Sequence, residues 1–318
     1  MTPSFDVLVP PDAPRGKRLD LYLVEDLQLC RRNRLRHQLE GLRCNGKEAK
    51  LSTRIGPGDR ISGTLVAPPP LVAEGEPLDF TILRQEPLYL VIDKPQGLVV
   101  HPGAGNRRGT LVNGLLWRYR DDPFFASAGR EDPSETVESF RPGIVHRLDK
   151  DTSGVMIVAR NPDVHHHLVE QFARGTVKKQ YLAIIRGRLV PDEGEIDAPV
   201  GRDPHHRQRF SVSPRGKAAR TLWKVLRRVP GYTLVLLRPL TGRTHQLRVH
   251  MASRGTPIVG DPIYGGREAP ASGVTLMLHA LTLQLSPAPG HEPVLFRSAV
   301  PHRFHQFLDT HSAASNSR

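Results

Sequence analysis

The chain has 318 residues and a formal net charge of +13, from 45 Lys and Arg against 32 Asp and Glu. This length suits one large domain and one small domain, and the positive charge favours a polyanionic partner, either nucleic acid or an anionic membrane surface. Two cysteines, Cys30 and Cys44, are too few for a disulfide framework or a four-ligand zinc site. No segment resembles a signal peptide or a membrane span, so we expect a soluble, cytoplasmic protein.

The first part of the chain predicts a small basic module at residues 15–75, preceded by a flexible tail at residues 1–14. Apolar residues at Leu19, Tyr22, Leu23 and Leu27 have helical spacing, and Asn45-Gly46 is typical of a tight hairpin turn. A second helix is predicted at residues 31–40. Clustered arginines on one side of it favour contact with an RNA backbone over an ordinary solvated surface. They are Arg31, Arg32, Arg34 and Arg36.

A Pro-rich stretch at residues 67–80 predicts a stiff linker, with the domain boundary near residue 75. The remainder, residues 76–310, mixes helices and strands in an irregular order, which favours an α+β fold over a doubly wound parallel sheet. Residues 121–142 are interpreted as an insertion loop, and residues 311–318 as a second flexible tail. Buried strands are predicted at 88–93, 154–159, 180–185 and 232–237, and helices at 162–174 and 244–255.

The segment GIVHRLDKDTSGVMIVAR, residues 143–160, places a polar loop directly before an apolar strand. Asp149 lies in this loop beside His146, Arg147 and Lys150. Nearby positive charge keeps a carboxylate ionised, and an ionised carboxylate can act as a nucleophile or as a base. On chemistry alone, an ordinary solvated turn explains the same pattern.

A second segment, residues 237–266, carries Arg243, His245, Arg248 and His250 at and after a turn that opens a helix. A helix N-terminus with arginines is suited to binding an anion. The anion is either an RNA phosphate or the carboxylate of the first segment.

Together these motifs resemble those of the RluA-type pseudouridine synthases. HRLDKDTSG, preceded by LYLVIDKPQGLVVHPGAGN and followed by TGRTHQLRVHM and GDPIYGG, carries the resemblance, which extends from about Lys17 to about Pro301. It is strongest to the branch that acts on large-subunit ribosomal RNA and has an N-terminal S4-like RNA-binding domain, to which GKRLDLYL and CNGK are similar. It fits an α+β catalytic domain with a mixed, largely antiparallel sheet and flanking helices, beside a small S4-like α/β module.

The resemblance also implies roles for particular residues. Asp149 matches the catalytic aspartate, and Arg147 matches an arginine that helps to push the target base out of the RNA stack. Tyr181 matches a tyrosine that packs on the uracil and assists proton removal from C5. Arg243 matches the arginine that pairs with the aspartate, and Leu247 an apolar residue of the pocket. We further expect substrate contacts from His146 in the same loop and from the basic helix, at Arg31, Arg32 and Arg36.

The implied reaction breaks the N1–C1′ bond of a uridine and rejoins the uracil through C5. It involves no redox change, so we expect no cofactor and no metal. Whether the aspartate attacks C1′ or takes a proton from C2′ stays open. The expected partner is structured RNA, either large-subunit rRNA or an assembly intermediate of it, bound by a monomer with no membrane contact. The alternatives are a tRNA-directed synthase of the same family and a non-catalytic RNA-binding assembly factor.

Overall fold

The computed structural model describes residues 4–29, 35, 39–66, 73–103, 106–128, 142–204, 206, 209–266 and 273–313. The chain divides into two compact units, residues 1–71 and 72–318. No helix in the described ranges is long and apolar enough to span a membrane.

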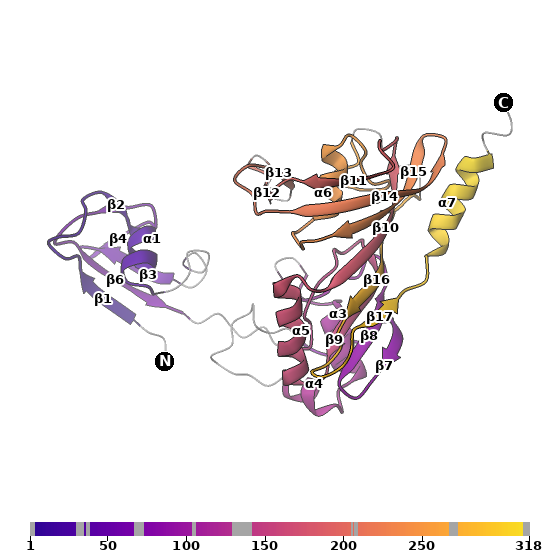
Figure 1. The fold of residues 1–318 in the computed structure, drawn as a ribbon. Coiled ribbons are helices and arrows are strands. Elements are labelled where there is room, and N and C mark those ends of the chain that lie inside the picture. Colours follow the sequence, from indigo (N-terminus) through magenta and orange to yellow (C-terminus); the bar gives the residue numbers. More distant parts are fainter. Residues whose placement is uncertain are drawn as a thin grey trace. The chain divides into compact units, whose positions relative to one another are not determined.

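The first unit is built mainly of strands (Figure 1). Its four-stranded sheet has the order β1 (Ser4–Leu8), β6 (Arg60–Leu65), β3 (Leu39–Cys44), β4 (Lys47–Glu48). A separate strand pair joins β2 (Lys17–Arg18) to β5 (Arg54–Ile55). The predicted first helix is present as a short helical stretch, α1 (Leu19–Leu21) followed by one π-helical turn, η1 (Tyr22–Asp26). Leu19 and Leu23 are fully buried in the core of this unit, as the helical spacing predicts.

Two expectations for this unit were wrong and one is confirmed. The tail expected at residues 1–14 instead contains β1, because the alternating residues Phe5 and Val7 pack against the core while β1 pairs with β6. Leu39 and Glu40, expected at the end of the second helix, instead belong to β3, and the other residues of that expected helix except Leu35 lie outside the described residues. The Asn45-Gly46 hairpin is confirmed, with both residues at positive φ (54° and 75°) between β3 and β4. The arginines Arg31, Arg32 and Arg36 lie outside the described residues, and the S4-like assignment stays a prediction.

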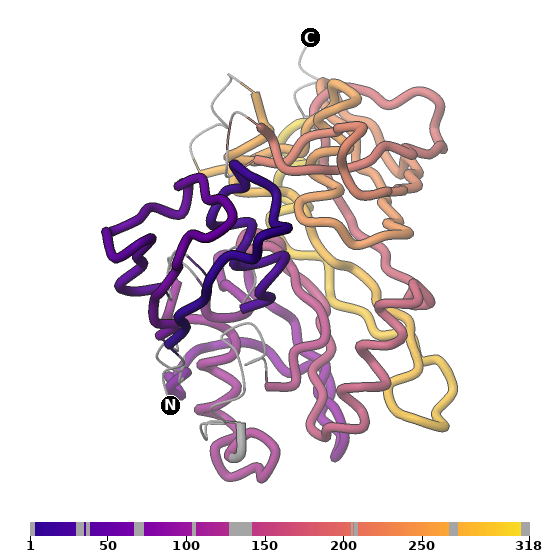
Figure 2. The backbone as a smooth tube through the Cα atoms, turned by 90° about the vertical axis from the view of Figure 1, so that its left-hand side faces the viewer, coloured from indigo at the N-terminus to yellow at the C-terminus, as the bar shows by residue number. Residues whose placement is uncertain are grey.

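The second unit contains a nine-stranded sheet that is antiparallel at every pairing except one. The exception is the short parallel pairing of β16 with β9. Strands from the middle and the end of the chain therefore run beside each other (Figures 1 and 2). The predicted α+β class with a mixed, largely antiparallel sheet is confirmed. The sheet order is β11 (Glu193–Asp197), β14 (Arg220–Val229), β15 (Tyr232–Pro239), β10 (Lys178–Arg186), β16 (Leu278–Leu285), β9 (Ser153–Ala159), β8 (Tyr89–Lys94), β7 (Thr81–Gln85), with β17 (Val294–Arg297) on β16.

Strands β8 and β9 are buried on both faces, which explains their nearly continuous apolar sequence. On one face Ile92 and Met156 pack in a cluster with α3 (Leu111–Arg118). On the other face Val91 and Ile157 pack in a cluster with α5 (Pro162–Arg174). Successive side chains of a strand point to opposite faces, so each strand contributes to both clusters.

Helix α5 begins and ends where the sequence predicts. The Asn161 side chain accepts hydrogen bonds from the backbone N–H groups of Asp163 and Val164, and Pro162 occupies the first turn. Gly175 ends the helix in a left-handed conformation (φ 72°).

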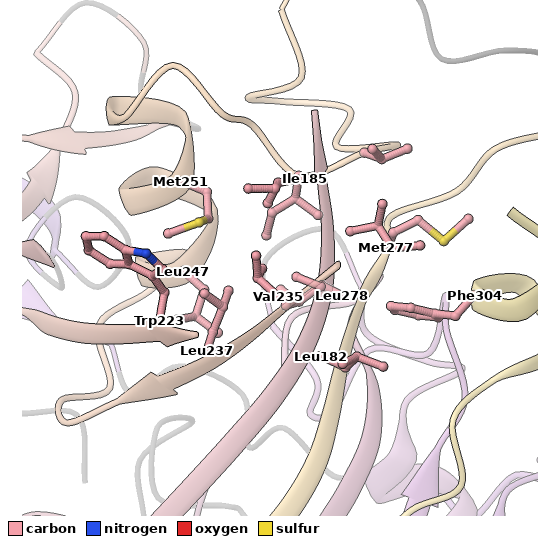
Figure 3. Packing of buried hydrophobic residues seen from close by; sticks show 14 of the residues in the cluster. Leu182, Ile185, Trp223, Val235, Leu237, Leu247, Met251, Met277, Leu278 and Phe304 are labelled. Carbon is pink, nitrogen blue, oxygen red and sulfur yellow. The ribbon is translucent and has the colours of Figure 1, made fainter. Parts of the chain in front are cut away.

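A third core cluster packs β10, β14 and β15 against α6 (Gln246–Ser253) and α7 (His302–Ala313). Figure 3 shows Leu247 and Met251 of α6 on the side that faces Trp223 and Leu237. Helix α7 runs to Ala313, so part of the tail expected at residues 311–318 is helical. The insertion expected at residues 121–142 contains α4 (Pro123–Ala128), and its residues 129–141 lie outside the described ranges. Strands β12 (Val200–Arg202) and β13 (Phe210–Val212) form a separate hairpin.

The glycine of the TSG motif provides a test of the parallel pairing. Gly154 has φ 123°, and a Cβ atom there would clash with the backbone oxygen of Ala280 on β16. We expect Gly154→Ala to lower the free energy of unfolding by about 3 kcal/mol or more, measured by urea denaturation. Gly290→Ala is the matched control, because Gly290 also has positive φ (77°) but nothing within 4 Å of the added methyl group. It should cost only about 1–2 kcal/mol. Equal losses in the two variants would contradict the proposed clash.

Candidate active site

A pocket of about 300 Å³ opens beside Asp149 in the second unit. Three parts of the chain form most of its wall: the polar loop before β9, the start of β10, and the turn that leads into α6. These parts are far apart in sequence, and the sheet brings them together. The pocket is lined by six of the residues predicted for the site: Asp149, Arg147, His146, Tyr181, Arg243 and Leu247.

The Asp149 loop is held through its backbone. The Lys94 ammonium group is fully buried and donates to the carbonyl oxygens of Pro95, Leu98 and Lys150 at 2.8, 2.8 and 3.0 Å. Gly97 N–H also donates to the Lys150 oxygen, at 2.9 Å. Burial lowers the pKa of Lys94 to about 8, although nearby carboxylates, among them Asp149, act in the opposite direction. The loop shape is therefore fixed by contacts that do not occupy the Asp149 side chain.

Arg248 on α6 connects Asp149 to a second, deeper carboxylate. Its Nε and Nη2 donate to the two oxygens of Asp261 at 2.7 and 2.8 Å, and its Nη1 donates to Asp149 Oδ2 at 3.3 Å. Asp261 is fully buried and also accepts the N–H groups of Ile263 and Tyr264. Burial alone would raise the pKa of Asp261, but Arg248 and these N–H groups lower it below its ordinary value. Asp149 keeps 19% of its side chain exposed, so it remains accessible from the pocket.

The expected partner of Asp149 was wrong. The family resemblance implies Arg243 in this role, whereas the guanidinium within hydrogen-bond distance is that of Arg248. Arg243 precedes α6, is exposed, and donates from Nε to the backbone oxygen of Ala218. Arg248 lies within the helix, 4% exposed, where its side chain reaches both carboxylates. The sequence did contain a signal for it, since GDPIYGG supplies a second acid, Asp261.

Tyr181 and Leu247 both line the pocket, and Leu247 also belongs to the core cluster beside β15. Burial raises the pKa of the Tyr181 phenol well above its ordinary value, and the Asp149 carboxylate adds to this shift. The phenol therefore stays neutral at physiological pH and can donate a hydrogen bond.

His245 is a pocket residue to which the sequence analysis gave no separate role. Its backbone is left-handed (φ 56°) directly before α6, and its Nε2 lies 3.9 Å from Asp149 Oδ2. Its Nδ1 is 2.9 Å from the Tyr264 hydroxyl, which in turn accepts the N–H of Phe210. Burial lowers the pKa of His245, although Asp149 acts against this, so the ring is neutral at neutral pH. In the tautomer in which Tyr264 donates to Nδ1, the Nε2–H faces the carboxylate.

His146 and Arg147 differ in environment although they are adjacent. Arg147 is exposed at the pocket, which suits the predicted contact with RNA. The His146 Nε2 accepts the N–H of Ile157 at 3.0 Å, and its ring stacks on Phe172 with a centroid distance of 4.6 Å. Burial, together with Lys179, lowers the pKa of His146 to about 3. The neutral ring thus attaches the loop to β9, and a direct role in substrate binding stays a prediction.

In the described part of the chain, no group of three or more His, Cys, Asp or Glu side chains is arranged to hold a metal ion.

Comparison with known proteins matches residues 88–253, which include the Asp149 loop, β10 and most of the α6 segment, to the RNA pseudouridylate synthase family. The chain belongs to this family. The synthase is 44% identical over 224 residues to an uncharacterized RNA pseudouridine synthase of Bacillus subtilis, covering 70% of each chain. It is 39% identical over 313 residues to the ribosomal large subunit pseudouridine synthase D of Xanthomonas campestris, covering 94% of this chain and 90% of that one.

Among solved structures, human RNA pseudouridylate synthase domain containing 1 matches this synthase with a TM-score of 0.54 and 27% identity. The match covers 73% of this chain and 85% of the human one. The RluA-type resemblance and the enzyme class expected from the sequence are confirmed.

The two arginines should behave differently on substitution. Arg248→Gln leaves Asp261 buried without its counter-charge, and we expect the free energy of unfolding to fall by about 3–5 kcal/mol. Arg243→Gln removes an exposed guanidinium, and we expect a change within about 0.5 kcal/mol. Urea denaturation of both variants measures the difference. If Arg243→Gln were the more destabilising change, the assignment of Arg248 as the structural partner would be wrong.

The partly buried, neutral His146 should make the folded state sensitive to acid. As pH falls below about 6.5, the unfolded chain binds a proton at this histidine that the folded chain does not bind until about pH 3. The free energy of unfolding should therefore decrease by about 1.4 kcal/mol per pH unit for this group. We expect His146→Gln to reduce the slope of stability against pH near pH 5 by that amount. His166→Gln, at an exposed position of α5, is the control for loss of a histidine, and an equal effect there would contradict the prediction.

Proposed function

We propose that this synthase isomerises specific uridines of large-subunit ribosomal RNA, with Asp149 as the catalytic carboxylate. The observation that carries the proposal is the position of Asp149, which is partly exposed in the pocket and within hydrogen-bond distance of Arg248. The choice of RNA is supported by relatives named ribosomal large subunit pseudouridine synthase D, which match 94% of this chain in Xanthomonas campestris and 92% in Nitrosomonas europaea.

The geometry suits a nucleotide turned out of the RNA stack. A base inside a helix does not expose C5 and C1′ together to a protein side chain, so the uridine has to leave the stack first. Arg147 is exposed at the pocket, where it can take the place of the departing base. Tyr181 and Leu247 supply aromatic and apolar surface for the uracil ring.

The chemistry we propose requires one ionised carboxylate at a fixed angle. The N1–C1′ bond breaks, the uracil turns, C5 bonds to C1′, and the proton lost from C5 is balanced by one gained at N1. Arg248 orients Asp149 for this reaction, because its guanidinium donates a hydrogen bond to the carboxylate at 3.3 Å. Both attack on C1′ and removal of a proton from C2′ are compatible with a carboxylate in this place.

The remaining parts of the proposal concern binding. We assign RNA binding to the first unit, with Arg31, Arg32 and Arg36 as backbone contacts, on the basis of its resemblance to an S4-like domain and the net charge of +13. A monomer in the cytoplasm that acts on naked rRNA or on an assembly intermediate completes the proposal.

Asp149→Asn tests the catalytic assignment, because it keeps the shape of the side chain and removes its charge. We expect a folded protein that binds RNA and forms no pseudouridine in the large-subunit rRNA of a strain lacking the gene, as measured by pseudouridine mapping. Asp151→Asn is the matched control, since the side chain of Asp151 does not line the pocket. It should retain activity. Full activity of the Asp149→Asn variant would refute the assignment.

A further inference from the structure

The pocket contains a second cation, the partly buried Lys179, which the catalytic scheme does not use. Lys179 follows exposed Lys178 on β10 and precedes Tyr181 by two residues, so Lys179 and Tyr181 share the face of the strand that lines the pocket. Its ammonium group donates to the Thr241 backbone oxygen at 3.5 Å, the longest acceptable distance for a hydrogen bond. Among the described residues, no carboxylate lies within ion-pair distance of it.

Charges around the pocket are unbalanced. The described lining contains four Arg and Lys residues and one carboxylate: Arg147, Lys179, Arg243 and Arg248 on one side of the balance, and Asp149 on the other. Asp261, directly behind, is already paired with Arg248. Burial lowers the pKa of Lys179, and no nearby carboxylate opposes this shift, in contrast to Lys94. Partial burial of a cation without a counter-charge costs folding free energy, so a role in binding explains the presence of Lys179 better than a role in folding.

We propose that Lys179 binds a backbone phosphate of the RNA strand next to the target uridine. The inference rests on the proposed function, because it takes RNA as the occupant of the pocket. Phosphodiester groups are the anions that RNA carries, and one of them would supply the charge that Lys179 lacks. A uracil carbonyl can accept a hydrogen bond from an ammonium group, but it brings no net charge and would leave the imbalance in place. The side chain of Lys179 approaches the Thr241-Gly242 backbone, on the wall of the pocket that leads from β15 toward α6.

The test is the salt dependence of RNA binding. The parent for this test is the full chain with Asp149→Asn, which prevents turnover. It is compared with a double variant that carries both Asp149→Asn and Lys179→Met, and the probe is unmodified large-subunit rRNA transcript. Loss of one phosphate contact should weaken binding about tenfold at low salt, since a charge-assisted hydrogen bond is lost. It should also reduce the slope of log affinity against log salt concentration by about 0.7–1.

Three controls make the result specific. Lys178→Met removes the same charge from the exposed, opposite side of the strand and should leave both affinity and slope unchanged. Lys179→Arg should restore the slope, because it restores the charge. The melting temperature of Lys179→Met should equal or exceed that of the parent, since a partly buried charge without a counter-charge is removed. A lower melting temperature would indicate a structural role and overturn the proposal.

Other outcomes would also overturn it. If Lys179→Met weakened binding equally at all salt concentrations, Lys179 would contact an uncharged group such as a uracil carbonyl. If binding were unchanged, it would contact no RNA. Failure of the proposed function can be told apart from failure of this inference. In the first case the unsubstituted protein forms no pseudouridine, whereas the dependence of RNA affinity on salt concentration is unaffected.

Discussion

The site depends on one guanidinium that two carboxylates share. Asp261 holds Arg248 with two short hydrogen bonds, and the remaining Nη1 reaches Asp149 at a longer distance of 3.3 Å. The difference matters because Asp261 is fully buried whereas Asp149 keeps part of its surface exposed. The deep pair fixes the position of the guanidinium, and the shallow contact orients Asp149 without covering it. A carboxylate held in this way has a fixed orientation and is still open to a substrate.

The sheet places this arrangement at the junction of two antiparallel halves. Strands β7, β8 and β9 form one half and β11, β14, β15, β10 and β16 the other, and the parallel contact of β16 with β9 joins them. The Asp149 loop directly precedes β9, while Tyr181 and Arg248 come from β10 and α6 of the other half. The pocket lining is therefore drawn from both sides of the junction, and the close approach of Gly154 to Ala280 keeps the halves in register.

Local sequence patterns predicted much of this architecture and part of the site. Buried strands, the hairpin at Asn45-Gly46 and both ends of α5 followed from apolar runs and turn chemistry, which act over a few residues. The partner of Asp149 could not be predicted from such local patterns. Its contact with Arg248 spans 99 residues and depends on which cation of the α6 segment faces inward. His245, directly before α6, also has a left-handed backbone, and a positive φ is too uncommon outside glycine to be predicted from one residue. Strand β1 was missed because its two core residues are set among prolines and polar residues.

The way in which the Asp149 loop is secured has a practical consequence. Lys94, Gln96 and Gly97 bind the carbonyl oxygens of Lys150 and Asp151, so the identity of the side chain at position 150 contributes nothing to that support. Lys150 is exposed and directly follows Asp149. A fluorescent label attached through a cysteine introduced there would be one residue from Asp149 and would leave the backbone hydrogen bonds of the loop intact. Such a chain would allow the arrival and departure of RNA to be timed separately from bond breaking.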